Sequence, residues 1–151
     1  MILQLKPLVF FFSLTILVLS TACSHKPEKI AFGKDQCVEC KMTIMDPKFG
    51  AEVVTKKGKK YKFDDTHCIA AFLERREVEL SNIKDVVFVV YGGNDEFVDV
   101  EQAEFVVSSK LNSPMGGAAA FKTKADAQKK SAELEGSKTT NWATLYNILI
   151  K

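Results

Sequence analysis

Residues 51–77, AEVVTKKGKKYKFDDTHCIAAFLERRE, contain the segments that decide the fold. Ala51–Thr55 and Lys59–Phe63 are rich in β-forming residues and flank a turn at Gly58, so they predict a β-hairpin. Apolar side chains then recur at helical spacing over residues 66–77. This spacing predicts an amphipathic helix that packs against the hairpin.

The rest of the chain indicates a repetition of this order. Val86–Tyr91 is a continuous apolar run typical of a buried strand, and it completes a strand-strand-helix-strand order. The segments that follow are predicted strands at Phe97–Val100, Glu104–Val107 and Ala118–Phe121, and helices over about 124–134 and over Trp142–Ile150. The residues placed to cap the three helices are Asp64 or Asp65, Thr123 and Thr140. The second half therefore resembles a diverged copy of the first.

The first residues have the pattern of an export signal. Leu8–Leu19 is apolar apart from two hydroxyl residues, and small residues follow it. Because the run is shorter than the roughly 20 residues that span a bilayer, residues 1–22 are interpreted as a signal peptide. Cys23 follows at once, which is typical of a lipoprotein whose cysteine thiol is lipidated. Ser20 stands where leucine is commonest in such signals, so cleavage by the ordinary signal peptidase is the alternative.

A lipid on Cys23 would keep the mature chain on a membrane surface, outside the cytoplasm. Residues 23–34 are then the lipidated cysteine and a polar tether, and residues 35–151 are a single small domain. The net charge of the whole chain is only +2, so no broad basic field is available for nucleic acid. We expect no nucleic-acid partner.

The cysteines that follow Cys23 point to a metal or a reactive thiol. Cys37, Cys40 and Cys68 are an odd number, which argues against a complete disulfide framework in an exported chain. Met42 extends the first pair to Cys-x-x-Cys-x-Met. Thiolate and thioether sulfur are soft donors that select copper(I). A thioether forms no disulfide, so it stays available in an oxidising compartment.

The cysteine pair also fits a structural disulfide, a thioredoxin-like redox pair or half of a zinc site. A redox pair usually lies at a helix N-terminus, which lowers the thiol pKa, and Asp46-Pro47 would end any helix here. A zinc site needs a second pair of ligands, but the adjacent His67 and Cys68 would point about 100° apart on a helix. We interpret Cys68 as a small buried hydrophobe and His67 as solvent-facing.

Met115 lies on a loop between Pro114 and Gly116-Gly117, and not on a periodic apolar face. Because a methionine that packs in a core usually comes from a helix or strand, Met115 is either exposed or presented to a ligand. Met45 is the weaker candidate, at the core or its rim.

Three motifs together resemble the NosL family, the copper lipoproteins accessory to nitrous oxide reductase. They are CVECKMTIMDPKF at 37–49, YKFDD at 61–65 and SPMGG at 113–117. The resemblance implies an α+β fold of two related β-β-α-β halves, at about 35–93 and 94–151, packed as one small domain. It also implies delivery of copper(I) in the periplasm to nitrous oxide reductase or another copper-accepting protein, in concert with a membrane ABC-type transporter complex.

Carried over residue by residue, the resemblance implies Cys40, Met42 and Met115 as copper(I) ligands. Cys37 is close enough to join them, to assist transfer or to protect Cys40. We therefore expect a lipid-anchored metallochaperone of the bacterial cell envelope, and no enzyme. One alternative is a thiol-disulfide reductase that uses Cys37 and Cys40 to keep copper-site cysteines reduced. The other is an organomercurial-lyase-like enzyme, in which Asp64 or Asp65 would protonate the carbon leaving group.

Overall fold

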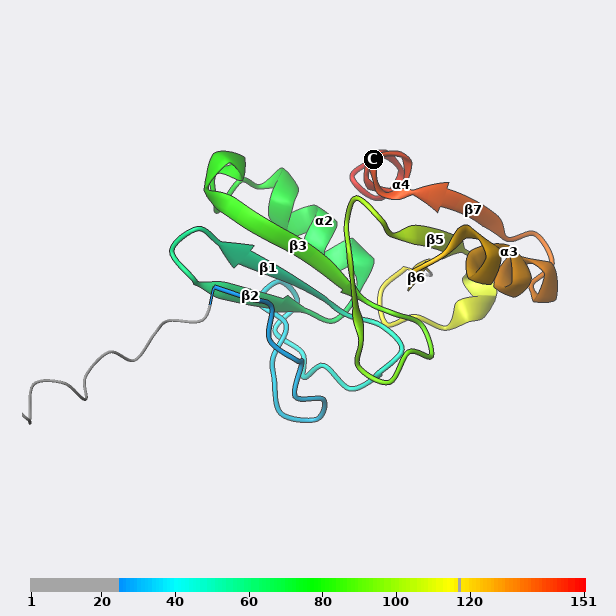
Figure 1. The fold of residues 1–151 in the computed structure, drawn as a ribbon, viewed down its shortest axis with the longest axis horizontal. Helices are drawn as coiled ribbons and strands as arrows, with labels where there is room; N and C mark the ends of the chain where they lie inside the picture. The colour runs from blue at the N-terminus through cyan, green and yellow to red at the C-terminus, as the bar shows by residue number, and fades with distance from the viewer. Residues whose placement is uncertain (1–24, 117) are drawn as a thin grey trace, which may run out of the picture.

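The computed structural model describes residues 25–116 and 118–151. Two small units, each with an antiparallel sheet and helices, lie side by side (Figure 1). The predicted α+β fold class is confirmed. The predicted signal peptide and the predicted lipidation site, Cys23, lie outside the described residues. Within the described part of the chain, no helix has the length and apolar character needed to cross a membrane.

The first unit is a β-β-α-β arrangement built on the predicted hairpin. Its elements are β1 (Ala51–Thr55), β2 (Lys60–Phe63), α2 (Thr66–Glu74), the 3-10 turn η2 (Leu80–Asn82) and β3 (Ile83–Val89). β1 lies between β2 and β3 and is antiparallel to both. Every residue of β1 is buried. This central strand is therefore covered on both faces, and the neighbouring elements pack around it.

Helix α2 begins at the predicted cap. Asp65 has an extended backbone, and its Oδ1 accepts a hydrogen bond at 2.8 Å from the N–H of the second helical residue. Such a cap stabilises a helix by about 1 kcal/mol. The helix ends at Glu74, three residues before the predicted end at 77, because Arg76 adopts a left-handed conformation with φ of 52°.

The strand expected at residues 97–100 belongs to the first sheet. β4 (Phe97–Asp99) pairs antiparallel with β3, and the sheet order is β2-β1-β3-β4. The prediction that this strand opens the second half is therefore wrong. The connection explains the difference: Gly92, Asn94 and Asp95 all have positive φ, which lets the chain reverse tightly and return along β3.

The second unit repeats the topology of the first. Its elements are β5 (Glu104–Val107), the 3-10 turn η3 (Ser109–Leu111), β6 (Ala118–Phe121), α3 (Lys124–Glu133), β7 (Lys138–Asn141) and α4 (Trp142–Leu149). The sheet order β6-β5-β7 places the first strand of the unit in the middle, as in β2-β1-β3. The predicted repeat of two β-β-α-β halves is therefore confirmed.

The predicted cap is correct for one of the two helices of this unit. Thr123 caps α3, as predicted. Helix α4 is capped by Asn141, whose side chain accepts a hydrogen bond from Thr144. The predicted cap, Thr140, is part of β7 and pairs with Phe105 in the sheet. It therefore lies one residue before the position that caps the helix.

Aromatic rings join the two units. The ring of Phe88 in β3 lies 5.0 Å from that of Phe105 in β5 and 4.8 Å from that of Trp142 in α4, measured between centroids. The Tyr146 hydroxyl on α4 donates to Glu74 Oε2 on α2 at 2.7 Å. The units therefore share one hydrophobic core.

Residues 25–34, the described part of the predicted tether, lie against the first sheet. The N–H of Glu28 donates to Oε1 of the buried Glu52 at 3.0 Å, and the Glu28 carboxylate pairs with Lys60 at 2.8 Å. Ile30 is buried in the core. Residues 25–34 therefore pack as part of the folded domain.

Candidate metal centre

A tight loop carries Cys37 and Cys40 to the start of α2. Gln36 and Thr43 form an antiparallel bridge across its base. The Cys37 N–H donates to the carbonyl of Met42 at 2.8 Å, and Lys41 turns the chain with φ of 64°. The loop is therefore a closed turn, with no helix at the cysteine pair.

Two contacts fix this loop to the first unit. The N–H of Val38 donates to the carbonyl of Lys62 in β2 at 3.0 Å. The Glu39 carboxylate forms an ion pair with both terminal nitrogens of Arg75, which directly follows α2. Because hairpin and helix both hold the loop, its cysteines have a defined position relative to α2.

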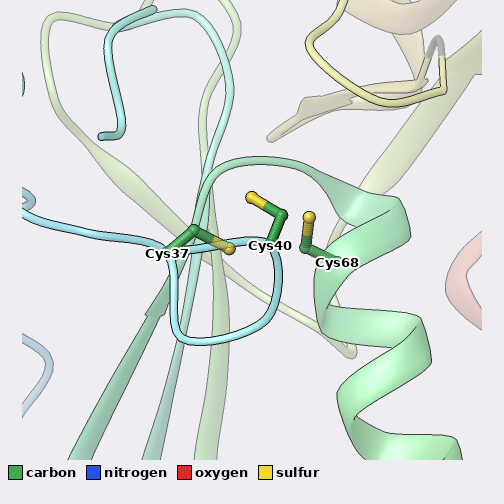
Figure 2. A group of neighbouring side chains, drawn as sticks. All are labelled: Cys37, Cys40 and Cys68. Carbon is green, nitrogen blue, oxygen red and sulfur yellow. The ribbon is translucent and has the colours of Figure 1, made fainter. Parts of the chain in front are cut away.

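The sulfur atoms of Cys37, Cys40 and Cys68 form one cluster (Figure 2), in which all three lie within 4.8 Å of one another. Cys68 comes from the first turn of α2, and Figure 2 shows its side chain beside that of Cys40. All three thiols are free. Cys37 and Cys68 are 0% and 1% exposed, whereas Cys40 is half-buried. The cluster is therefore reached from solvent through Cys40.

The hydrogen bonds around Cys37 favour its thiolate form. The Cys68 thiol donates to the Cys37 sulfur, and so do the backbone N–H groups of Cys40, Asp64 and Glu39; together they lower the pKa of Cys37 to about 5. The hydrogen bond to Cys37 and burial raise the pKa of Cys68, and burial raises the pKa of Cys40. The cluster therefore favours a thiolate at Cys37 over a thiolate at Cys40 or Cys68.

A buried carboxyl lies next to this cluster. Burial, followed by the negative charge of Cys37, raises the pKa of Asp64 to about 6. Its neighbour Asp65 is the helix cap described above. Of the two candidate carboxyls for the lyase alternative, Asp64 is therefore the one with a raised pKa.

The side chains of the predicted methionine ligands, Met42 and Met115, are exposed, as is that of Met45. Met42 and Met115 are 46% and 42% exposed, and Met45 is 65% exposed. The backbone N–H of Met42 is hydrogen-bonded to the Cys40 sulfur. The N–H of Met115 donates to Oδ2 of Asp65 at 3.2 Å, which holds its loop at the first turn of α2. The second unit thus brings Met115 to the end of α2 that carries Cys68.

Comparison with known proteins identifies the family of this chain. The family model of NosL matches residues 30–147. The chain belongs to the NosL family. The crystal structure of the copper chaperone NosL from Shewanella denitrificans is 24% identical, with a TM-score of 0.63, and the match covers 78% of this chain and 92% of that chain. That likeness shows a shared fold. Among curated proteins, none matches the chain.

In this member of the NosL family, Cys68 has a place that its sequence position did not reveal. It is buried, as predicted, but its sulfur faces the other two sulfurs of the cluster. His67, one residue earlier, is half-buried beside Gly116 and lies outside the sulfur cluster. The one sequence signal for Cys68 was the odd number of cysteines, since nothing local links it to Cys37.

Proposed function

We propose that this chain is a copper(I) metallochaperone, which takes up the ion through sulfur ligands and passes it on by ligand exchange. The observation that carries this proposal is the half-buried Cys40 sulfur beside the buried sulfurs of Cys37 and Cys68 in a NosL-family fold. Sulfur donors without oxygen or nitrogen favour copper(I) over hard cations. A chaperone also needs a ligand that an acceptor can reach from solvent, and the half-buried Cys40 meets that need.

The proposed ligands are Cys40, Met42 and Met115, with Cys37 close enough to bind or to assist transfer. Met42 and Met115 have exposed side chains on segments hydrogen-bonded to Cys40 and Asp65. Thioethers add no charge and bind more weakly than thiolates, so copper held by them remains transferable.

The proposed setting is the periplasmic face of a bacterial membrane, with a lipid on Cys23. Residue 25 already contacts the first sheet, since the Lys84 amine donates to the carbonyl of His25 at 2.7 Å. Two extended residues reach at most about 7 Å, so a lipid at position 23 would hold the domain close to the membrane. The proposed partners are an ABC-type transporter complex and a copper acceptor, nitrous oxide reductase or another copper protein.

Anaerobic titration of the reduced protein with copper(I) and a competing chelator tests the function. We expect Met42→Leu and Met115→Leu each to weaken copper(I) binding by about tenfold, since leucine conserves volume and removes the donor. The melting temperature of the copper-free protein should hardly change because both side chains are exposed. Met45→Leu is the matched control and should bind as the wild type does. A wild-type protein that binds no copper(I) would rule out the proposal.

Membrane attachment has its own test. We expect Cys23→Ser to move the protein from the membrane fraction to the soluble fraction, or to block processing, because the acceptor of the lipid is lost. Cys68→Ser, expressed in the same way, controls for the loss of a thiol elsewhere. An unchanged membrane fraction for Cys23→Ser would show that another feature attaches the chain.

Thiol-disulfide reduction is the second candidate, favoured by the proximity of the free Cys37 and Cys40 sulfurs and the lowered pKa of Cys37. The absence of a helix N-terminus at the pair does not exclude a redox role, because a hydrogen bond from the Cys68 thiol and backbone N–H groups lower the pKa of Cys37 instead. Reduction of a model disulfide by the copper-free protein distinguishes the two functions: a reductase requires Cys37 and Cys40 but is indifferent to Met42→Leu and Met115→Leu.

A further inference from the structure

We propose that one end of the first unit is a docking face for the surface of an anionic phospholipid bilayer. This face, which we call the basic end, consists of the β1–β2 turn with Lys56, Lys57 and Lys59 and of the exposed Leu80 beside it. The inference rests on the membrane setting proposed above. It adds to the lipid a second contact with the bilayer, made by the folded domain itself.

The β1–β2 turn concentrates positive charge. The sequence KKGKK at residues 56–60 has four lysines in five positions. Lys60 forms an ion pair with Glu28 at 2.8 Å. The other three lysines are exposed, and within the described part of the chain they form no ion pair. The Lys59 amine lies 4.6 Å from the centroid of the Tyr61 ring, a contact that leaves its charge intact. Three exposed positive charges are therefore available to an anionic surface.

The neighbouring carboxylates do not cancel this charge. Glu77 and Glu79 line the same pocket as the three lysines. Glu77 is paired with Arg75 at 3.2 Å, which leaves Glu79 as the carboxylate of this pocket that offsets the lysines. Nearby on β3, Lys84 is balanced by Asp85 at 3.4 Å. Positive charge therefore exceeds negative charge at the basic end.

An exposed apolar side chain lies beside the lysines. Leu80 is the first residue of η2 and is 53% exposed. The Lys56 N–H donates to the carbonyl of Asn82 at 2.8 Å, which holds η2 against the hairpin turn. At a bilayer surface a leucine can enter the acyl boundary while neighbouring amines stay at the lipid phosphates. Leucine next to lysines therefore fits a bilayer better than it fits free phosphate.

The described chain begins at this same end. Figure 1 shows its first residues, the β1–β2 turn and the α2–β3 connection at one end of the first unit. The His25 ring lies against the turn, with its Cδ2 atom 3.3 Å from the place that a Cβ would take on Gly58. Because two extended residues span about 7 Å, a lipid at position 23 would bring the basic end to the bilayer.

Docking at the basic end would orient the metal centre away from the bilayer. β1 runs from Ala51, which pairs with Phe63, to Thr55 at the turn. Asp64, directly after Phe63, donates its N–H to the Cys37 sulfur, so the cysteines lie at the opposite end of the hairpin. Five strand residues span about 17 Å. The cysteine cluster is thus about one strand length from the lysines, where a soluble acceptor can approach it.

The test is the reactivity of lysines in the full chain bound to lipid vesicles, measured with an amine-specific reagent and mass spectrometry. Each lysine near an anionic surface strengthens binding by about fivefold. With phosphatidylglycerol mixed into phosphatidylcholine, the three amines of the basic end should therefore react at least about fivefold more slowly than with phosphatidylcholine alone. High salt should remove the difference. The exposed lysines 124, 129 and 138 of the second unit are the internal control and should react equally in both lipids.

Paired substitutions test the contribution of charge. Lys56→Gln with Lys57→Gln should remove most of the protection of Lys59. Lys124→Gln with Lys129→Gln makes the same change of charge on the second unit and should leave that protection intact.

Two results would overturn the inference: equal reactivity of the basic end in both lipids, or an equal decrease at the control lysines. Copper(I) binding is measured separately, so either result would leave the chaperone function standing. A chain that does not float with phosphatidylcholine vesicles would lack the lipid anchor, and its protection by vesicles with phosphatidylglycerol would still report docking of the basic end.

Discussion

Replacing Cys40 with serine should weaken copper(I) binding more than any other single substitution at the cluster, by at least about 100-fold, or 2.7 kcal/mol. Cys40 is the half-buried member of the three-sulfur cluster, and the Met42 N–H is hydrogen-bonded to its sulfur. A serine hydroxyl is a hard donor that stays protonated at neutral pH, so it does not replace a thiolate ligand.

Competition titration checks this prediction, with Met45→Leu as the control for a change at an exposed sulfur near the same loop. The melting temperature of copper-free Cys40→Ser should stay near the wild-type value, because oxygen and sulfur differ little in volume. A loss of affinity smaller than about tenfold would mean that copper is held without Cys40. The ligand would then have to come from the two buried cysteines.

The elements predicted correctly are those whose pattern is local. The hairpin of β1 and β2 and the start of α2 follow from β-forming residues around Gly58 and from apolar spacing after Asp65. By contrast, β7 (Lys138–Asn141) contains no apolar residue and is mostly exposed. It is a strand because it pairs with β5. This pairing is a tertiary contact, and the spacing of apolar residues in the sequence does not reveal it.

The residues of the candidate site divide in the same way, into those that sequence spacing links and those that tertiary packing brings together. Cys37, Cys40 and Met42 are adjacent in sequence, so their spacing alone suggested a common ion. Cys68 joins them only because α2 packs at the end of the hairpin, and its burial is compatible with simple packing. The loop of Met115 reaches this end of the molecule through its hydrogen bond to Asp65, fifty residues earlier in the chain. Its residue type was informative, but its location depended on how the two units pack.

Replacing Phe88 with alanine should lower the free energy of unfolding by about 3–5 kcal/mol, because a fully buried aromatic ring is removed and a cavity remains. This is a large share of the roughly 5–15 kcal/mol typical of a domain. Phe88 contacts the rings of Phe105 and Trp142 from the second unit. The substitution therefore weakens the packing between the two units. Phe72→Ala, which removes an equally buried ring that packs on Phe63 inside the first unit, is the matched control.

Both variants should be less stable in denaturant titrations, but only Phe88→Ala should change the fluorescence of the folded protein, since Trp142 is the single tryptophan of the chain. The same packing between the two units determines where the Met115 loop lies relative to the cysteine cluster. Under conditions in which Phe88→Ala is still folded, Met115→Leu should therefore weaken copper(I) binding less in the Phe88→Ala protein than in the wild type. Equal effects of Met115→Leu in both proteins would show that its loop is held by Asp65 alone, independently of how the two units pack.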